Sequence, residues 1–315
     1  MKRCFVYPGQ GAQYVGMGKD IYDRYPGAHR IFDRATQCAG FDVAALLWDG
    51  TDEDLKATDR SQVAITVVNL AARAALAERG IVSDAAAGFS LGEYAALVDA
   101  GVISEDDCLT LVVERGRIME RVSRSLDGAD GSAGMAAVLG IDSETIETAL
   151  ADGGVEGVYP ANLNSPVQTV LSGTAAGLAA AEPVLKAAGA RRVVVLKVSG
   201  PFHSPLMSDA RTAFAAVLDR VEFSDPSKPL YSNVTGARVG SGTEIRRLCA
   251  DQLVMPVRWV DEEAHIAADG YDELLEVGPG EVLGGLWKAY LKSADGVDVP
   301  CRPAGTVDTI ETIAQ

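Results

Sequence analysis

Gly88-Phe89-Ser90-Leu91-Gly92 is the most informative stretch of this 315-residue chain. It has the form G-x-S-x-G, in which a serine lies on a sharp turn between a strand and a helix with its hydroxyl exposed. The flanks agree: Ala85-Ala86-Ala87 is typical of the end of a buried strand, and residues 91–100 predict a helix that Gly101 ends. We therefore expect a strand–turn–helix unit of an α/β protein. A plain Ser/Gly turn is the alternative at this point.

Short apolar runs and helix-ending glycines on either side of this stretch predict further strands and helices. Phe5-Val6-Tyr7 predicts a strand that leads into a glycine-rich turn at residues 8–13. Residues 51–54 (Thr-Asp-Glu-Asp) resemble a capping box, which predicts a short helix after them. Further expected elements are helices over residues 61–79 and 104–124 and buried strands over residues 229–233 and 273–277.

The pattern changes after a linker of composition Asp-Gly-Ala-Asp-Gly-Ser at residues 127–132. The β-α-β-β-α-β order that follows is that of the ferredoxin-like unit. We therefore expect an α/β fold in two parts: a core with a parallel sheet from residues 1–128 and 200–315, and an inserted ferredoxin-like subdomain over residues 129–199. The elements expected in the insert are strand 134–140, helix 142–151, strands 155–164 and 168–172, helix 174–188 and strand 191–198.

The overall charge excludes several classes of partner. The chain carries a formal net charge of -16 at pH 7. Such a surface repels nucleic acid and anionic membranes, so we expect neither as a partner. No stretch approaches about 18 apolar residues without a charge, so the sequence predicts no membrane-spanning helix.

The cysteines and the N-terminus indicate the compartment. The cysteines form no C-x-x-C pair, and no histidine lies at ligand spacing from them. This pattern favours free thiols in a reducing compartment over a zinc site, so we expect no metal. Residues 1–8 lack the apolar run of a signal peptide, and the expected location is the cytoplasm. The five cysteines are Cys4, Cys38, Cys108, Cys249 and Cys301.

A serine nucleophile needs a general base, and the chain has only three histidines. His29 and His265 lie in stretches typical of solvated helix faces, which favours a structural role for both. His203 follows the last strand of the insert, in the loop Gly200-Pro201-Phe202-His203-Ser204-Pro205. Prolines on both sides restrict this loop, and its place at the end of the insert predicts that His203 lines a cleft.

Seven motifs spread over nearly the whole chain occur together in one order. They are Pro8-Gly9-Gln10-Gly11-Ala12-Gln13, Gly88-Phe89-Ser90-Leu91-Gly92-Glu93-Tyr94, Arg115-Gly116, Asn162-Leu163-Asn164-Ser165-Pro166, Gly200-Pro201-Phe202-His203, Gln252 before Pro256-Val257-Arg258-Trp259, and Glu276-Val277-Gly278-Pro279-Gly280. Together they make the chain resemble the malonyl-CoA:acyl carrier protein transacylases, the acyltransferases of fatty acid and polyketide synthesis. The resemblance implies an α/β-hydrolase-like core with a ferredoxin-like insert, in agreement with the predicted order of strands.

The resemblance also implies a role for each chemical group. Ser90 would attack the thioester carbonyl, and His203 would take its proton and return one to the leaving thiol. The backbone N–H groups of Gln10 and Leu91 would form the oxyanion hole. Gln252 lies in the segment that, in this family, supports the histidine through a backbone carbonyl. The sequence offers no aspartate as a third member, so we expect a dyad.

Arg115 would set the acyl specificity, because a planar guanidinium binds the free carboxylate of a malonyl group bidentately. Without the resemblance, an arginine in Val113-Glu114-Arg115-Gly116-Arg117 is more typical of a helix surface. Phe202 and Leu91 match the malonyl-preferring pattern of the wider family, and a bulky Phe202 would leave little room for a methyl branch. Asn162 is expected in the same substrate pocket.

The chain departs from the family at the residue before the nucleophile, where Phe89 replaces the usual histidine. Since the base is His203, we expect the chemistry to survive while the rate or the substrate range shifts. Arg191, Arg192 and Lys197 form a basic cluster on the strand that leads to His203. This cluster is either a solvated strand edge or a contact with CoA phosphates and with the acidic surface of a carrier protein.

The leading interpretation is an enzyme that moves malonyl from malonyl-CoA to acyl carrier protein by a ping-pong route through acyl-Ser90, with no cofactor beyond its thioester substrate. A serine hydrolase of thioesters or esters on the same fold is the first alternative. Arg115 argues against it, since acyl hydrolases resembling this family lack that arginine. A non-catalytic binding module is the second alternative. The sequence leaves open whether the carrier serves fatty acid or polyketide synthesis, and the family precedent for the oligomeric state is a monomer.

Overall fold

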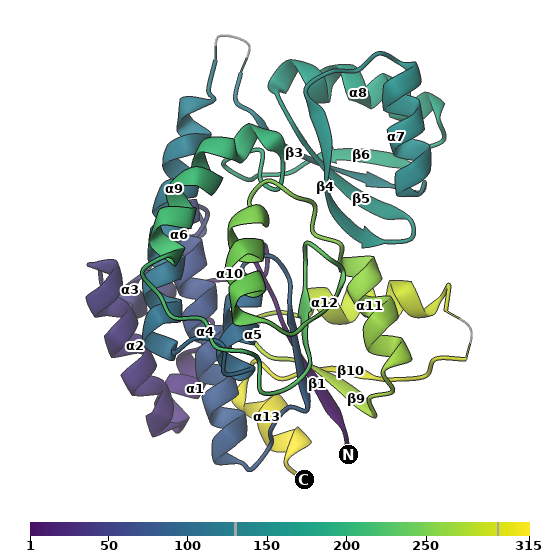
Figure 1. The fold of residues 1–315 in the computed structure, drawn as a ribbon. Coiled ribbons are helices and arrows are strands. Elements are labelled where there is room, and N and C mark those ends of the chain that lie inside the picture. Colours follow the sequence, from purple (N-terminus) through teal and green to yellow (C-terminus); the bar gives the residue numbers. More distant parts are fainter. Residues whose placement is uncertain (129–130, 295) are drawn as a thin grey trace.

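Two β-sheets, each with helices packed against it, organise the chain in the computed structural model, which describes residues 1–128, 131–294 and 296–315 (Figure 1). The larger sheet has six strands in the order β10-β9-β1-β2-β7-β8. Its strands are parallel from β10 to β7, and only β8 runs antiparallel to its neighbour. Their bounds are β1 (Arg3–Tyr7), β2 (Ala85–Gly88), β7 (Leu230–Ser232), β8 (Ala237–Val239), β9 (Glu273–Glu276) and β10 (Cys301–Pro303).

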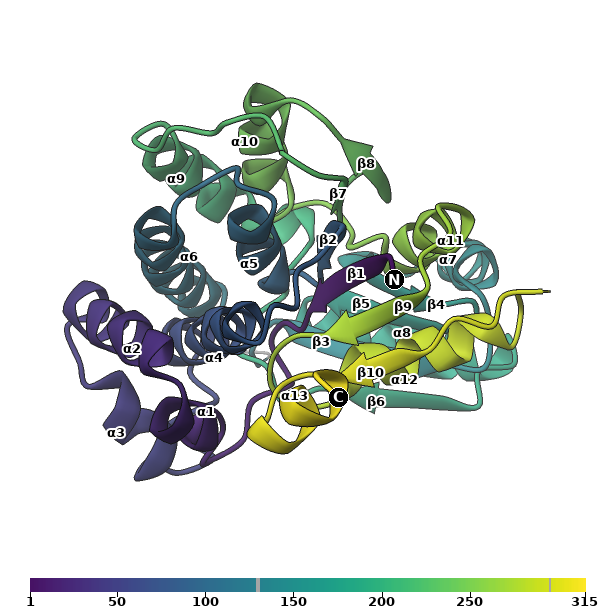
Figure 2. The same ribbon diagram turned by 90° about the horizontal axis from the view of Figure 1, so that it is seen from below.

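Helices cover both faces of the larger sheet because its central strands are apolar on both sides (Figure 2). In β1, Phe5 and Tyr7 join the large core cluster, while Cys4 and Val6 pack on the opposite face with Trp259 and Trp287. The first face carries α2 (Pro26–Ala39), α4 (Thr58–Glu78), α5 (Gly92–Asp99), α6 (Glu105–Ser125), α9 (Ser208–Leu218) and α10 (Gly242–Asp251), and the second carries α11 (Trp259–Ala268) and α12 (Val282–Leu291).

Short elements complete this part of the chain. They are α1 (Lys19–Arg24), α3 (Val43–Trp48), the 3₁₀-helix η1 (Pro205–Met207) and α13 (Val307–Ile313). The short helix predicted after residues 51–54 is absent, so that prediction is wrong. Thr51 and Asp54 do exchange hydrogen bonds, but residues 52–56 form turns, and the next helix is α4, which begins at Thr58. The hydrogen bonds between Thr51 and Asp54 close a turn, but the residues that follow lack the apolar stripe that would stabilise a helix there.

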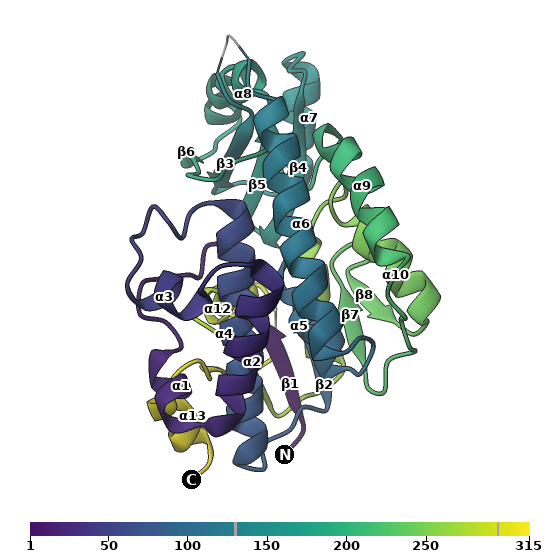
Figure 3. The same cartoon turned by 90° about the vertical axis from the view of Figure 1, so that its left-hand side faces the viewer.

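The smaller sheet lies at one end of the larger one, beside the C-terminal part of the long helix α6 (Figures 1 and 3). Its four strands are antiparallel, in the order β4-β5-β3-β6. Val138 and Leu171 on one face pack against α7 and α8, whereas Met135 and Val170 on the other face join the large core cluster. The bounds are β3 (Gly134–Leu139), α7 (Ser143–Asp152), β4 (Val158–Ser165), β5 (Gln168–Gly173), α8 (Ala175–Ala187) and β6 (Arg192–Val195).

Backbone contacts join the smaller sheet to the larger part of the chain. Leu163 donates to the carbonyl of Val257 over 2.8 Å, and Val257 donates to the carbonyl of Ala161 over 2.8 Å. Ser172 donates from its hydroxyl to the carbonyl of Phe202, the residue before His203. The loop that carries His203 is therefore held between the two sheets.

The α/β architecture predicted from the sequence is confirmed, with the difference that the larger sheet is mixed at its β8 edge. The second part follows the predicted succession of strands and helices, although β6 is shorter than the expected strand over residues 191–198. The predicted linker at residues 127–132 includes residues 129 and 130, which lie outside the described residues.

Within the described part of the chain, no helix is both long enough and apolar enough to cross a membrane.

Candidate active site

Ser90 lies in the turn between β2 and α5, with a backbone φ of 50°. This left-handed conformation is costly for a residue with a side chain, by about 1–3 kcal/mol, and is found mostly at functional sites. Glycines make the turn possible: a Cβ at Gly92 would lie 2.0 Å from the carbonyl oxygen of Tyr7, and one at Gly88 would lie 2.2 Å from that of Gly92. The turn predicted from the G-x-S-x-G pattern is therefore a tight crossing of two backbone segments.

Asn233, just after β7, ties this turn to the sheet. Its Oδ1 accepts the backbone N–H of Ser90 over 2.6 Å, and its Nδ2 donates to the carbonyl of Gly88 over 2.7 Å. Nδ2 also donates to the buried Glu262 over 2.7 Å. The side-chain amide of Asn233 therefore bonds to the backbone at both Gly88 and Ser90, and these two bonds stabilise the unusual backbone conformation of Ser90. No sequence motif had pointed to Asn233.

Ser90 and His203, which are 113 residues apart, lie in direct contact. Ser90 Oγ is 2.8 Å from His203 Nε2, and His203 Nδ1 is 2.7 Å from the backbone carbonyl of Gln252. A carbonyl can only accept, so Nδ1 carries the proton and Nε2 offers its lone pair to the serine hydroxyl. His203 also has a positive φ of 58°, held by the loop that Ser172 anchors.

Burial and a nearby cation keep His203 neutral. The side chain is buried, and its pKa is lowered to about 4, first by desolvation of the charged form and then by the positive charge of Arg115. The hydrogen bond to Gln252 opposes this shift. At neutral pH the imidazole can therefore act as a base toward Ser90.

Two backbone N–H groups beside Ser90 have no hydrogen-bond partner among the described residues: those of Gln10 and Leu91. The loop after β1 reaches the serine turn so closely that a Cβ at Gly9 would lie 2.2 Å from the carbonyl oxygen of Phe89. Only glycine fits at that position. The close approach brings the segment that carries Gln10 next to Leu91, where two free donors can stabilise a developing negative charge.

Arg115 is buried within α6, with 1% of its surface exposed. Its Nη1 donates to Gln62 Oε1 over 2.8 Å, and its Nη2 donates to Gln252 Oε1 over 3.0 Å, while Nε has no partner among the described groups. No described carboxylate lies within ion-pair distance of the guanidinium, whose pKa is lowered by desolvation. The guanidinium also lies over the ring of Tyr94, 5.5 Å from its centroid. A buried cation held by neutral groups can accept an incoming carboxylate.

The side chain of Gln252 connects several of these groups. Its Oε1 accepts from Arg115, and its Nε2 donates to the backbone carbonyl of Ser90 over 3.1 Å and to the carboxylate of Glu93. Its backbone carbonyl holds His203. One residue therefore contacts the nucleophile's main chain, the base and the cation. From the sequence, only the carbonyl of Gln252 was expected to take part, and no role was predicted for Glu93 or Gln62.

A cavity of about 180 Å³ lies at the junction of the two sheets and is lined by Ser90, His203, Arg115 and Gln10. Phe202 and Asn162, predicted for the substrate pocket, also line it. Phe89 forms part of the wall and packs edge-to-face on Trp259, with ring centroids 5.4 Å apart, so the departure at position 89 makes this wall apolar.

The predicted basic cluster is not one cluster. Arg191, at the start of the exposed edge of β6, lines a hollow with Lys292, and this hollow shares Gln168 with the central cavity. Lys197 lines a different hollow, together with Lys56. The two ends of the strand point to separate surfaces because several residues of extended chain separate them. Arg192 is exposed beside Arg191.

The other predicted assignments are structural. His29 Nε2 donates to the carbonyl of Tyr22 over 2.8 Å, and the His29 ring stacks on that of Tyr22. His265 Nδ1 donates to the carbonyl of Asp261, four residues before it. Both lie on exposed helix faces, in α2 and α11, as predicted.

Among the described residues, no group of three or more His, Cys, Asp and Glu side chains is arranged to hold a metal ion. The five cysteines are unbridged.

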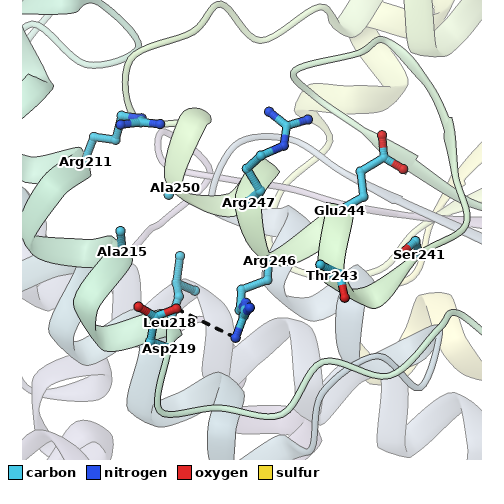
Figure 4. A pocket seen from close by; sticks show the side chains of 10 residues that line it. All are labelled: Arg211, Ala215, Leu218, Asp219, Ser241, Thr243, Glu244, Arg246, Arg247 and Ala250. Carbon is cyan, nitrogen blue, oxygen red and sulfur yellow. Dashed lines mark ion pairs between the residues drawn. The ribbon is translucent and has the colours of Figure 1, made fainter.

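A wider hollow of about 500 Å³ lies between α9 and α10, away from the serine (Figure 4). Its arginines pair with nearby acids: Arg246 lies 3.7 Å from Asp219, and Arg211 and Arg247 both contact Asp251. It contains no nucleophile with an adjacent base. The smaller central cavity is therefore the better candidate for chemistry.

The serine–histidine pair, the free N–H donors and the adjacent cation form an arrangement suited to acyl transfer through a covalent serine intermediate. Residues 4–308 match the acyl transferase domain family. The chain is 39% identical to the malonyl CoA-acyl carrier protein transacylase of Bacillus subtilis (strain 168) over 289 residues, 91% of this chain and 90% of that protein. The chain therefore belongs to the acyl transferase domain family, and within it to the malonyl CoA-acyl carrier protein transacylases.

Solved structures of this family have the same fold. An acyl carrier protein S-malonyltransferase from Vibrio cholerae O1 biovar eltor str. N16961 superposes with a TM-score of 0.91 at 35% identity, covering 99% of this chain and 100% of that one. A malonyl-transacylase solved in complex with its type II PKS acyl-carrier protein superposes with a TM-score of 0.91 at 34% identity, covering 99% and 98%. The family resemblance stated from the sequence motifs is confirmed.

Proposed function

We propose that the protein transfers a malonyl group from malonyl-CoA to the phosphopantetheine thiol of an acyl carrier protein. The observation that carries this proposal is the buried Arg115, whose guanidinium borders the same cavity as Ser90 and lacks a carboxylate partner among the described residues. The names of the relatives and the solved complex with a carrier protein support both the acyl group and the acceptor.

Two similar half-reactions make up the proposed mechanism. Ser90 Oγ attacks the thioester carbonyl while His203 Nε2 takes its proton, and the N–H groups of Gln10 and Leu91 stabilise the oxyanion. When the tetrahedral intermediate collapses, the C–S bond breaks and His203 protonates the leaving CoA thiolate. The thiol of the carrier protein then attacks acyl-Ser90, with His203 as base, and Ser90 recovers its proton. These steps use only side chains, backbone donors and the thioester.

Arg115 pairs with the malonyl carboxylate in this mechanism, and Phe202 and Asn162 line the space around the acyl group. The two amides that hold the guanidinium leave its Nε and further N–H groups free for a bidentate contact. A hydrolase of uncharged acyl groups would have no use for a buried cation at this position, so Arg115 favours the transferase over the hydrolase alternative.

Replacing Arg115 with alanine is expected to lower kcat/KM for malonyl transfer by a factor of hundreds or more, because a buried carboxylate would lose its charged partner. Acetyl-CoA has no carboxylate, so acetyl transfer should change little or increase. The measurement is the malonyl-to-acetyl ratio of kcat/KM. Arg117→Ala is the matched control, since Arg117 lies two residues away on the exposed side of α6.

An unchanged ratio in Arg115→Ala would remove Arg115 from the substrate site. If free malonate also formed faster than malonyl-carrier protein in the unaltered enzyme, the hydrolase alternative would replace the transferase. Binding of malonyl-CoA without any acyl-enzyme would favour the non-catalytic binding module.

The acidic limb of the pH profile should report His203. Below its pKa of about 4 the imidazole is protonated and cannot take the serine proton, so kcat/KM for acetyl transfer should fall about tenfold per pH unit there and be level up to neutral pH. Acetyl-CoA is the substrate of choice because it does not involve the carboxylate site. In Arg115→Ala the limb should move to higher pH, since a cation that lowers the pKa is removed. A limb near the ordinary histidine pKa of about 6.5 in the unaltered enzyme would contradict a buried, neutral base.

We also propose that residues 1–128 and 200–315 form an α/β-hydrolase-like core and that residues 129–199 form a ferredoxin-like subdomain. The serine turn directly after a parallel strand supports the first assignment. The succession β3-α7-β4-β5-α8-β6 and the neighbour order β4-β5-β3-β6 support the second. The proposed start of the subdomain, residue 129, lies outside the described residues.

Arg191, Arg192 and Lys197 remain candidate contacts for CoA phosphates or for an acidic carrier protein. Arg191 is the best placed of the three, because its hollow adjoins the central cavity at Gln168. The monomeric state and the cytoplasmic location stay predictions, as does the choice between a fatty acid and a polyketide carrier.

A further inference from the structure

Glu93 is a buried carboxylate close to the proposed nucleophile, and the mechanism above does not use it. It lies in the first turn of α5, three residues after Ser90, and 3% of its surface is exposed. Its carboxylate accepts from Gln252 Nε2. A buried carboxylate is expensive unless it makes such bonds, so its position next to the site requires an explanation.

The side-chain amide of Gln252 has a different kind of neighbour at each end. The NH₂ end faces acceptors only: the carboxylate of Glu93, the carbonyl of Ser90 at 3.1 Å and Asn233 Oδ1 at 3.4 Å. The oxygen end faces a donor, Arg115 Nη2, at 3.0 Å. Rotating the amide by half a turn would place its NH₂ against the guanidinium and its oxygen against the carboxylate, and both contacts would be repulsive.

We infer that Glu93 is a positioning residue for acyl specificity: it orients the side-chain amide of Gln252, which in turn holds the Arg115 guanidinium in place for the malonyl carboxylate. Glu93 offers the nearest of the three acceptors at the NH₂ end of Gln252. Burial raises the pKa of Glu93 to about 7, and its carboxyl group keeps an acceptor oxygen in either protonation state. Asn233 Oδ1 is already occupied by the N–H of Ser90 at 2.6 Å and is the most distant of the three.

This inference rests on the proposed function, and it separates two properties that Gln252 combines. The orientation of the His203 ring depends on the backbone carbonyl of Gln252, whereas the position of the Arg115 guanidinium depends on the side chain of Gln252. Disturbing the amide should therefore affect substrates that carry a carboxylate more than substrates that lack one. A purely structural role for Glu93 would instead lower transfer of both acyl groups together.

The test compares Glu93→Met, which keeps the volume but cannot accept a hydrogen bond, with Glu93→Gln, whose amide oxygen can still accept from Gln252. In Glu93→Met the malonyl-to-acetyl ratio of kcat/KM should fall about tenfold, the size expected when a buried donor loses its hydrogen-bond partner. In Glu93→Gln the ratio should stay within about threefold of the unaltered enzyme, because orientation rather than charge is needed. The acidic limb assigned to His203 should not move in either variant.

Glu273→Met is the matched control, since Glu273 is also a buried carboxylate but pairs with Arg3 Nε at 2.6 Å, at the opposite end of the parallel strands. Should Glu93→Met fail to fold, Gln252→Met removes the same amide from the other side and keeps the backbone carbonyl, and its malonyl-to-acetyl ratio should fall by a similar factor. When both single variants fold, the variant that combines Glu93→Met with Gln252→Met should lower the malonyl-to-acetyl ratio no further than the more severe single variant does, because both substitutions break the same contact.

Two results would overturn the inference. One is an unchanged malonyl-to-acetyl ratio in Glu93→Met, or in Gln252→Met where that variant replaces it, including the case of equal losses for both acyl groups. The other is a fall of the ratio in Glu93→Gln as large as in Glu93→Met. Absence of malonyl transfer in the unaltered enzyme would instead refute the proposed function. Normal malonyl transfer with an unchanged ratio in the variants would refute only the role of Glu93.

Discussion

Replacing Ser90 with alanine is expected to abolish both malonyl transfer and formation of the acyl-enzyme. Ser90 is the only serine among the described residues whose hydroxyl contacts a histidine, at 2.8 Å, and no other group at the site offers an activated oxygen. Loss of the nucleophile in enzymes with this chemistry costs about 10⁶-fold in kcat. Intact-protein mass spectrometry after mixing with malonyl-CoA should show a malonyl adduct on the unaltered protein and none on Ser90→Ala.

Ser208→Ala is a suitable control for this experiment. Ser208 lies on the exposed end of α9 near the histidine loop, and its hydroxyl bonds only to the carbonyl of Pro205. Its adduct should match that of the unaltered protein. A comparison of thermal unfolding would check that Ser90→Ala is folded. An adduct of equal yield on folded Ser90→Ala would place the covalent chemistry on another residue.

Replacing His203 with alanine is expected to lower kcat/KM for transfer by several orders of magnitude. Without the imidazole, the serine hydroxyl has no acceptor for its proton, and the leaving thiolate has no donor. His29→Ala and His265→Ala should have near-normal rates, because both rings are exposed and bond to nearby backbone carbonyls, those of Tyr22 and Asp261. Single-turnover measurement of acyl-enzyme formation would isolate the first half-reaction.

Two outcomes would contradict the proposed dyad. One is a severe defect in His265→Ala with a mild defect in His203→Ala. The other is persistence, in His203→Ala, of an acidic limb near pH 4, since that limb is assigned to the imidazole that the variant lacks.

The parts of the fold that were predictable are those set by local signals. The strand β2, the turn at Ser90 and the start of α5 follow from glycines at positions where any side chain would clash with backbone. The helix α4 ends just before Gly80, the glycine predicted to end it. The helix α6 begins after the predicted cap Ser104, whose hydroxyl accepts from Asp107 N–H. Such signals act over a few residues, so one sequence is enough to detect them.

Elements without such signals at both ends were predicted without bounds or were not predicted. The stretch around His29 was expected to be helical, but its limits were not given. Its regular stripe of buried residues, among them Ile31, Phe32 and Ala35, would have marked α2 in a systematic search for helical periodicity. The order of strands in the larger sheet depends on pairings between distant segments, such as β1 with β9, and no local pattern records them.

The site shows the same division. Ser90 and His203 could be proposed because the types of residue and their surroundings are unusual, whereas Gln62, Glu93 and Asn233 are defined by contacts with residues far away in the chain. One signal was available: Gln62 and Asn69 are polar residues in the otherwise apolar stretch of α4, and buried polar side chains often have specific partners. The strand that carries Arg191 and Lys197 shows the opposite case, because these two residues are close in sequence but line different hollows.

The support of His203 by a backbone carbonyl has a consequence for how this enzyme can vary. In a serine–histidine–aspartate triad, a single substitution of the aspartate removes the group that orients the base. Here every amino acid at position 252 brings a carbonyl oxygen with it, so the base keeps a partner whichever side chain is present, as long as α10 ends in the same place. Position 252 can therefore be randomised to search for new acyl preferences, and losses of activity in such a library would report on Arg115 and on the main chain of Ser90, which the side chain contacts, rather than on the base.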